Sequence, residues 1–191
     1  MGVEVAATAI AEVKVVTPQV FCDARGWFCE TWSGSVFAAQ GIEAAFVQDN
    51  QSLSRDLYTL RGLHFQKPPR AQGKLVRCLK GSILDIAVDI RHGSPTFGRH
   101  VAEVLSEENR KQMYVPMGFA HAFLTLTPDS EVFYKVTDTY APDCDVGIAW
   151  DDPALGIDWG VPFEAISCSD KDRRHPRLAD LPPLFVYGQG C

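Results

Sequence analysis

Short stretches in which apolar and polar residues alternate follow one another along most of the chain. The clearest stretch is GSILDIAVDI at residues 81–90. A period of two places successive side chains on opposite faces of a β-strand. One face carries Leu84, Ile86, Val88 and Ile90, and the other carries Ile83, Asp85, Ala87 and Asp89. Similar patterns predict further strands at residues 100–106, 111–116, 121–127 and 131–140, punctuated by Gly, Pro, Asp and Asn.

Helical patterns are few and short. They occur at residues 33–42, where Gly41 is a plausible stop, and at residues 106–112. Many short strands with so few helices predict an all-β sandwich or barrel and not a βαβ fold. The length of 191 residues is that of one domain, 1–191. We expect its core at about 14–165 and a C-terminal loop segment with an apolar plug at 166–191.

The N-terminal residues 3–20 form additional apolar strand material that a closed barrel would not need. An exposed strand edge of this kind normally pairs with a partner, so this arm predicts a homodimer. The first residues also lack the basic stretch of a signal peptide, and Glu4 and Glu12 interrupt their apolar residues.

Composition and charge narrow the function classes. Apolar residues make up 46% of the chain, which is typical of a globular protein. The formal net charge is −6, whereas nucleic-acid-binding domains are usually basic. The six cysteines contain no C-x-x-C pair, and Cys78 lies in an apolar strand pattern. We therefore predict a cytoplasmic protein with reduced thiols and with neither a nucleic-acid nor a membrane partner.

Two segments carry unusual polar residues. In TLRGLHFQKPP, at residues 59–69, His64 follows an arginine and a glycine, and in VPMGFAHAF, at 115–123, His121 follows a turn in a pattern typical of cupins. A metal cupin would have a second histidine where Gln66 stands and a glutamate nearby, whereas Lys74 is present instead. Two histidines beside a lysine are a poor metal site. Without a G-x-G-x-x-G stretch, we predict neither a metal nor a nicotinamide cofactor.

Seven motifs in order give the chain a family resemblance. They are FCDARGWFCETW, QDNQS, LRGLHFQ, GSPTFGR, YVPMGFAHAF, VFYKVTDTY and SDKD, within about residues 14–185. In order and spacing they resemble the dTDP-4-dehydrorhamnose 3,5-epimerases. The resemblance implies a cupin-type jelly roll without metal, usually a homodimer. It also implies a nucleotide-linked 4-keto-6-deoxy sugar as substrate, inverted at C3, C5 or both.

The resemblance assigns catalytic roles to four residues. His64 is the base that removes a proton beside the ketone, and Asp172 is the carboxylate that orients it. Lys74 stabilises the enolate, and Tyr134 is the acid on the opposite face. Taken alone, each has a plainer interpretation. His64 and Tyr134 could be core residues, Lys74 a solvated lysine, and Asp172 part of a capping box, with Asp170 as a rival carboxylate.

The resemblance also assigns substrate contacts. Arg61 and Arg25 match pyrophosphate contacts, Tyr140 matches a residue packed on the nucleotide base, and His121 matches a histidine that holds polar groups. The other matching positions are Phe28, Glu30, Gln48 and Asn50.

The spacing of Arg61 and His64 raises a difficulty. Residues three apart on a regular strand face opposite ways, so a bulge at Gly62, or a rim or dimer contact, is needed. We predict that His92, His100 and His175 lie on the surface.

Three alternatives remain open from the sequence. They are an epimerase that inverts a single centre, a metal-dependent cupin dioxygenase, and a sugar-binding barrel without activity. The incomplete ligand set argues against the dioxygenase, which metal analysis would test. The presence of both an acid and a base argues against a barrel that only binds a sugar.

Overall fold

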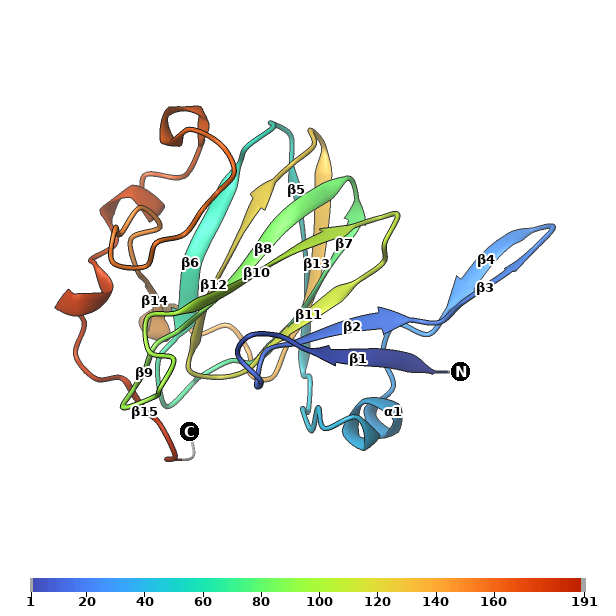
Figure 1. Cartoon of the computed structure of the whole chain (residues 1–191), viewed down its shortest axis with the longest axis horizontal. Coiled ribbons are helices and arrows are strands. Elements are labelled where there is room, and N and C mark those ends of the chain that lie inside the picture. Colours follow the sequence, from blue (N-terminus) through green and yellow to red (C-terminus); the bar gives the residue numbers. More distant parts are fainter. Residues whose placement is uncertain (1, 190–191) are drawn as a thin grey trace.

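Two antiparallel β-sheets face each other in the computed structural model, which describes residues 2–189 (Figure 1). The strand pattern predicts an all-β sandwich or barrel, and this one is the jelly roll that the resemblance implies. The six-stranded sheet runs in the order β1 (Val3–Ala7), β2 (Lys14–Pro18), β11 (Gln112–Val115), β7 (Lys74–Lys80), β13 (Ser130–Val136) and β5 (Gln48–Ser54). The five-stranded sheet runs in the order β10 (His100–Ser106), β8 (Ser82–Asp89), β12 (Phe119–Thr125), β6 (Leu60–Gln66) and β14 (Asp145–Gly147).

The remaining elements are short. Two small ribbons pair β3 (Val20–Asp23) with β4 (Gly26–Cys29) and β9 (Arg91–His92) with β15 (Phe185–Val186). The helices are α1 (Gly34–Ala39) and the 3-10 turns η1 (Pro142–Cys144), η2 (Phe163–Ala165), η3 (Asp172–Arg174) and η4 (Leu178–Asp180). No helix among residues 2–189 is long and apolar enough to cross a membrane.

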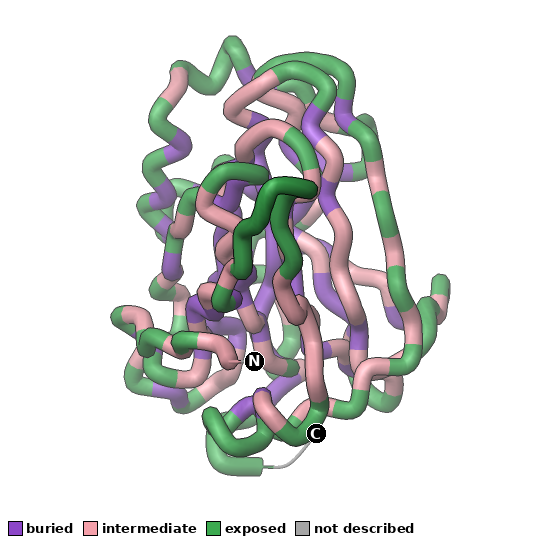
Figure 2. Tube along the Cα trace, turned by 90° about the vertical axis from the view of Figure 1, so that its right-hand side faces the viewer, coloured by how far each residue is buried: buried purple, intermediate pink, exposed green. Residues whose placement is uncertain are grey.

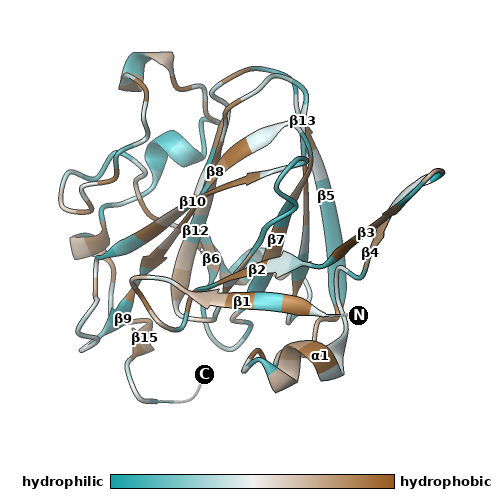
Figure 3. Ribbon diagram, turned by 45° about the vertical axis from the view of Figure 1, so that its right-hand side comes forward, coloured by the Kyte–Doolittle hydropathy of each residue, from teal (hydrophilic) through white to brown (hydrophobic). Residues whose placement is uncertain are grey.

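The space between the sheets is filled at one end by apolar side chains. Ile83 and Ala87 of β8 meet Leu105, Met113 and other buried residues there. Cys78 is part of this cluster, as its strand pattern predicted. In Figure 3 the edge strand β5 stands out as hydrophilic, because its sequence is QDNQSLS. The barrel interior is therefore apolar at one end and lined by polar strand residues elsewhere.

The outer face of the five-stranded sheet is also covered. Ile86 and Val88, on the opposite face of β8 from Ile83, pack against Trp150, Trp159 and further side chains from residues 148–185. Figure 2 shows buried residues gathered in the middle of the molecule and exposed residues on the segments that project from it. Both faces of β8 are consequently covered, and Ile166, Leu178 and Phe185 of the C-terminal segment take part in covering the outer one. The last two residues of the predicted segment, 190–191, lie outside the described residues.

Two N-terminal features project beyond the barrel. The hairpin β3–β4 extends away from the body (Figure 1) and exposes large apolar side chains, including Trp27 and Phe28. Strand β1 forms the outer edge of the six-stranded sheet and pairs with β2 alone. The predicted N-terminal strand arm is therefore present.

The prediction of a helix at residues 106–112 was wrong. The segment is a tight turn between β10 and β11. The Asn109 side chain accepts hydrogen bonds from the backbone of Ser106 and Lys111, while the Ser106 hydroxyl accepts one from the Asn109 amide. Such local side-chain bonds compete with helix formation.

Candidate active site

A cavity of about 520 Å³ lies where β5, β6, β7, β12 and β13 meet the segment 167–172. A second cavity of about 240 Å³ adjoins it. His64, Lys74 and Tyr134 line both. The three side chains therefore stand at the junction of two spaces, one on either side.

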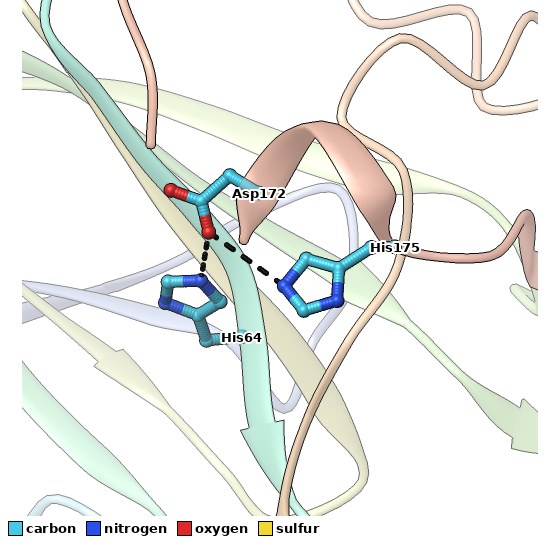
Figure 4. Close-up of side chains that lie close together, drawn as sticks. All are labelled: His64, Asp172 and His175. Carbon is cyan, nitrogen blue, oxygen red and sulfur yellow. Dashed lines mark hydrogen bonds and ion pairs between the residues drawn. The ribbon is translucent and has the colours of Figure 1, made fainter. Parts of the chain in front are cut away.

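His64 and Asp172 form a close pair at this junction (Figure 4). The His64 Nε2 lies 2.5 Å from the Asp172 Oδ1, and the carboxylate is 4% exposed. Burial would raise the pKa of Asp172, but the hydrogen bond and charge of His64 and a bond from Ser169 hold it below its ordinary value. Asp172 therefore stays ionised. With Nε2 donating to the carboxylate, Nδ1 is the ring nitrogen left to accept a proton.

Asp172 also takes part in the capping interaction considered as an alternative, but only through its backbone amide. Its amide donates to the Ser169 Oγ at 3.1 Å, while its carboxylate contacts His64. The rival carboxylate Asp170 is exposed. The structure thus brings the Asp172 side chain, and not that of Asp170, to His64.

Lys74 lies beside a second carboxylate–histidine pair. Its Nζ donates to the His64 backbone oxygen at 3.4 Å, and burial lowers its pKa to about 8, although the charges of Asp85 and Asp145 act in the opposite direction. Deeper in the barrel, His121 Nε2 lies 2.8 Å from Asp85 Oδ1, and both residues are buried. Burial also lowers the pKa of His121, against the effect of Asp85, so this imidazole is neutral at neutral pH.

Asp85 was missed from the sequence as a site residue. It shares a face with Ile83 and Ala87, which lie in the apolar interior, and its Oδ2 has no hydrogen-bond partner among residues 2–189. An acidic residue on the inward face of an otherwise apolar strand is the signal that could have identified it, because buried carboxylates need a partner.

Tyr134 projects from β13 into the cavity with its ring partly packed on the apolar interior. Burial raises its pKa above 10, although the positive charge of Arg61 acts against this. Its hydroxyl is therefore protonated at neutral pH and able to donate.

Gly62 resolves the spacing of Arg61 and His64. In the β6–β12 ladder His121 pairs with His64 and Phe123 pairs with Arg61, so β6 has one extra residue there. Gly62 has φ +137°, and a Cβ at this position would collide with Ala122. The predicted bulge is confirmed, and Arg61 and His64 line the same cavity.

The second cavity holds several of the predicted binding residues. Gln48 and Asn50 are joined by a hydrogen bond of 2.8 Å, and the Tyr140 amide donates to the Gln48 side chain at 3.0 Å. The Tyr140 side chain remains 57% exposed, with its hydroxyl 3.2 Å from Asp145. A flat aromatic face is thus left open beside two amides.

Arg25, Phe28 and Glu30 are not brought to these cavities within one chain. Arg25 and Phe28 lie on the projecting hairpin, where the Arg25 side chain is 91% exposed and pairs with Asp23. Glu30 follows the hairpin, and none of the three lines either cavity.

The prediction that His175 lies on the surface was wrong. Its side chain is only 10% exposed and its Nε2 lies 3.6 Å from the Asp172 Oδ1. Its ring packs over Gly147, the residue opposite His64 in the β14–β6 ladder. His92 and His100, by contrast, are half-exposed and away from the cavities.

Gln66, at the position of the missing cupin histidine, is fully engaged with the backbone. Its amide nitrogen donates to the Arg70 oxygen at 2.7 Å, and its oxygen accepts from the Ala141 amide at 2.7 Å. Both ends of the side chain therefore brace loops beside the site.

A jelly-roll barrel with a histidine held by an ionised carboxylate, a desolvated lysine and a protonated tyrosine around one junction is an enzyme equipped for proton transfer. The family model for dTDP-4-dehydrorhamnose 3,5-epimerase matches residues 7–180, and the chain belongs to this family.

Individual relatives agree with this assignment. A dTDP-4-dehydrorhamnose 3,5-epimerase of Sinorhizobium fredii is 49% identical over 179 residues, which cover 94% of this chain and 91% of that protein. The crystal structure of a dTDP-6-deoxy-D-glucose-3,5-epimerase from Legionella pneumophila, in complex with dTDP-4-keto-L-rhamnose, has a TM-score of 0.93 and 40% identity, covering 98% of this chain and 100% of that one. A 3'-monoepimerase from Streptomyces bikiniensis, in complex with dTDP-quinovose, has a TM-score of 0.84 and 33% identity, covering 95% and 92%.

Proposed function

We propose that this enzyme inverts C3 and C5 of dTDP-4-dehydro-6-deoxyglucose to give dTDP-4-dehydrorhamnose. A hydrogen beside the C4 ketone can leave as a proton because the charge spreads onto the ketone oxygen as an enolate. The chemistry needs a base on one face of the sugar, an acid on the other and a positive charge at the oxygen. The observation that carries the proposal is the meeting of His64, Tyr134 and Lys74 at one junction.

His64 is the proposed base. Its Nδ1 takes the proton from the sugar while Nε2 remains hydrogen-bonded to Asp172. The ionised carboxylate stabilises the imidazolium that forms, as in other His–carboxylate pairs.

Lys74 is the proposed partner of the enolate oxygen. A buried ammonium group interacts with developing negative charge more strongly than a solvated one, because little water screens it. The lowered pKa of about 8 is a consequence of the same burial. His121 lines this part of the cavity, and its contact with the buried Asp85 holds it in place.

Tyr134 is the proposed acid. It approaches the junction from β13, in the sheet opposite to the His64 strand β6. A base and an acid from facing sheets can act on opposite faces of a sugar held between them, which is what inversion requires.

We propose that the second cavity receives the nucleotide. The exposed Tyr140 ring suits stacking on a base, while Gln48 and Asn50 offer amide contacts. Arg61, which lines the larger cavity, suits the pyrophosphate.

Arg25, Phe28 and Glu30 would reach the site of a neighbouring copy, so the working unit is a homodimer. The projecting hairpin with its exposed aromatic residues and the unpaired edge of β1 support this arrangement. Light scattering on the full-length chain should give twice the 21.1 kDa mass of one chain. A clean monomer at micromolar concentration would contradict it.

Product NMR after incubation with dTDP-4-dehydro-6-deoxyglucose tests the function. We expect inversion of both centres, and turnover that survives exhaustive chelation because the chemistry uses only protein side chains. A single-centre epimerase is the second candidate, favoured by the likeness to the Streptomyces bikiniensis monoepimerase. Product inverted at one centre alone would select it, and unchanged substrate would refute both.

A further inference from the structure

His175 is a largely buried histidine next to the His64–Asp172 pair, and it has no role in the proposed chemistry. The ring centroids of His175 and His64 lie 5.6 Å apart at an angle of 77°. Figure 4 shows the His175 Nε2 aimed at the same carboxylate oxygen that His64 contacts. This nitrogen is buried and has no hydrogen-bond partner among residues 2–189. A buried unpaired ring nitrogen is costly, so it points to a missing ligand.

The position of the ring is fixed by the surrounding backbone. A Cβ at Gly147 would fall on the His175 ring, so only a glycine leaves the space that the ring fills. The η3 turn, closed by the bond from the Arg174 amide to the Lys171 oxygen, holds Asp172 and His175 three residues apart on one side. The fold therefore holds the imidazole of His175 beside the His64–Asp172 pair, as a third possible donor to a ligand, before any ligand binds.

The donor atoms of His64, Asp172 and His175 all lie within 4.8 Å of one another. Two imidazoles and one carboxylate are a common ligand set for Zn²⁺, with bonds of about 2.0–2.2 Å that leave tetrahedral donors about 3.4 Å apart. The observed separations at the Asp172 Oδ1 are 2.5 Å to His64 and 3.6 Å to His175. An ion would replace the proton that His64 and Asp172 share, and the distance between their two donor atoms would increase by about 1 Å.

The local charges favour this site over the cupin position. Lys74 stands beside the incomplete cupin set, whereas Lys171, four residues before His175, pairs with Asp145 at 2.5 Å. The buried Asp172 supplies the negative charge that a divalent ion needs.

We propose that His64, Asp172 and His175 form a binding site for Zn²⁺ or a similar imidazole-binding divalent ion, and that its occupation inhibits the enzyme reversibly. The inhibitory part rests on the proposed role of His64 as the base. A neutral imidazole bound to an ion through Nε2 carries its proton on Nδ1 and has no lone pair left to accept another. The ion also takes the Asp172 oxygen that would stabilise an imidazolium.

The test titrates Zn²⁺ into metal-free full-length protein and measures both turnover and calorimetric binding. We expect one ion per chain, loss of more than about nine-tenths of turnover, and recovery with a chelator. His175→Phe keeps a ring over Gly147 but removes the donor nitrogen. It should retain turnover and require roughly 10–100-fold more Zn²⁺, the usual effect of weakening a metal shell.

Two controls separate this site from other ligands. His92→Phe removes a half-exposed histidine outside the cavities and should leave the Zn²⁺ response unchanged. Cys168→Ser removes a thiol that lines the larger cavity and should also leave it unchanged. If Cys168→Ser abolishes inhibition, or His175→Phe responds as the wild type does, the proposed site is wrong.

Failure of this inference is distinguishable from failure of the proposed function. Metal-free wild type without epimerase activity would refute the function, while calorimetry on the same protein would still test the site. If His175→Phe does not fold, Gly147→Ala displaces the ring while keeping its nitrogens, and weaker Zn²⁺ binding is again expected. Unchanged binding by Gly147→Ala would overturn the site.

Discussion

The two ends of the barrel interior are built by the same strands and serve opposite purposes. On β7, Cys78 lies in the apolar cluster while Lys74 reaches the cavity, and on β13, Val132 lies in the cluster while Tyr134 reaches the cavity. The apolar end gains stability from burial. The polar end buries ionisable groups, and its lysine pays a penalty visible as a pKa of about 8. The apolar end therefore stabilises the barrel, while the polar end can present ionisable side chains for catalysis.

Removing the base should have the largest effect on turnover. In His64→Ala no enolate forms, so both inversion and exchange of the sugar α-hydrogens with heavy water should fall by roughly 10²–10⁴-fold. NMR in heavy water measures both rates. His92→Ala, outside the cavities, is the matched control and should behave as the wild type. Wild-type exchange in His64→Ala would remove His64 from the mechanism.

Removing the buried cation should come next. Lys74→Met keeps most of the side-chain volume but not the charge, and should slow exchange and inversion together by roughly 10²–10³-fold because both pass through the enolate. Lys135→Met on β13, where the lysine pairs with Asp49 at the surface, is the control. If Lys74→Met slows inversion alone, Lys74 does not act on the shared enolate.

The pH dependence should give a smaller and reversible loss. Lys74 is protonated below its pKa of about 8 and neutral above it, so turnover should fall as pH rises through this value. The same lowering from 10.5 means that the unfolded chain binds more protons between about pH 8 and 10.5, so the contribution of Lys74 to folding stability increases there. Alkaline inactivation without loss of the circular dichroism signal is the expected pattern. A turnover rate that stays level to pH 10 would contradict it.

A substitution at the apolar end should have the smallest effect on turnover. Leu105→Ala empties a fully buried position and should lower the free energy of unfolding by about 2–5 kcal/mol in urea titration. Turnover per folded molecule should not change. The neighbouring Val104, which is 45% exposed, supplies the control Val104→Ala. A large loss of turnover in folded Leu105→Ala would show that the two ends are coupled.

Local patterns predicted most of the barrel and the residues at its junction. Strand patterns in the sequence located β8, β10, β12 and β13, because successive side chains of a strand face opposite ways whether one face or both are covered. The bulge at Gly62 could be predicted because two residues three apart had to share a face. The match to the family's SDKD motif favoured Asp172 as the partner of His64, and the Asp172 carboxylate is the one that contacts His64.

Features that depend on distant segments could not be predicted. The His175 side chain is largely covered because η3 brings it onto Gly147, and nothing in the residues around either position indicates that contact. Asp85 pairs with His121 across neighbouring strands in the same way. The position of Arg25 relative to the cavity depends on how the hairpin is placed, and the placement in a single chain leaves it outside.

The central claim is a division of labour between a base on β6 and an acid on β13, and the ratio of hydrogen exchange to inversion in Tyr134→Phe tests it most directly. This variant loses only the hydroxyl, so the enolate still forms and His64 returns a proton to the original face. Deuterium should enter with retained configuration while inversion falls by roughly 10²-fold or more. Tyr114→Phe on the other side of the six-stranded sheet is the control. Inversion of both centres at the wild-type rate by Tyr134→Phe would contradict the account.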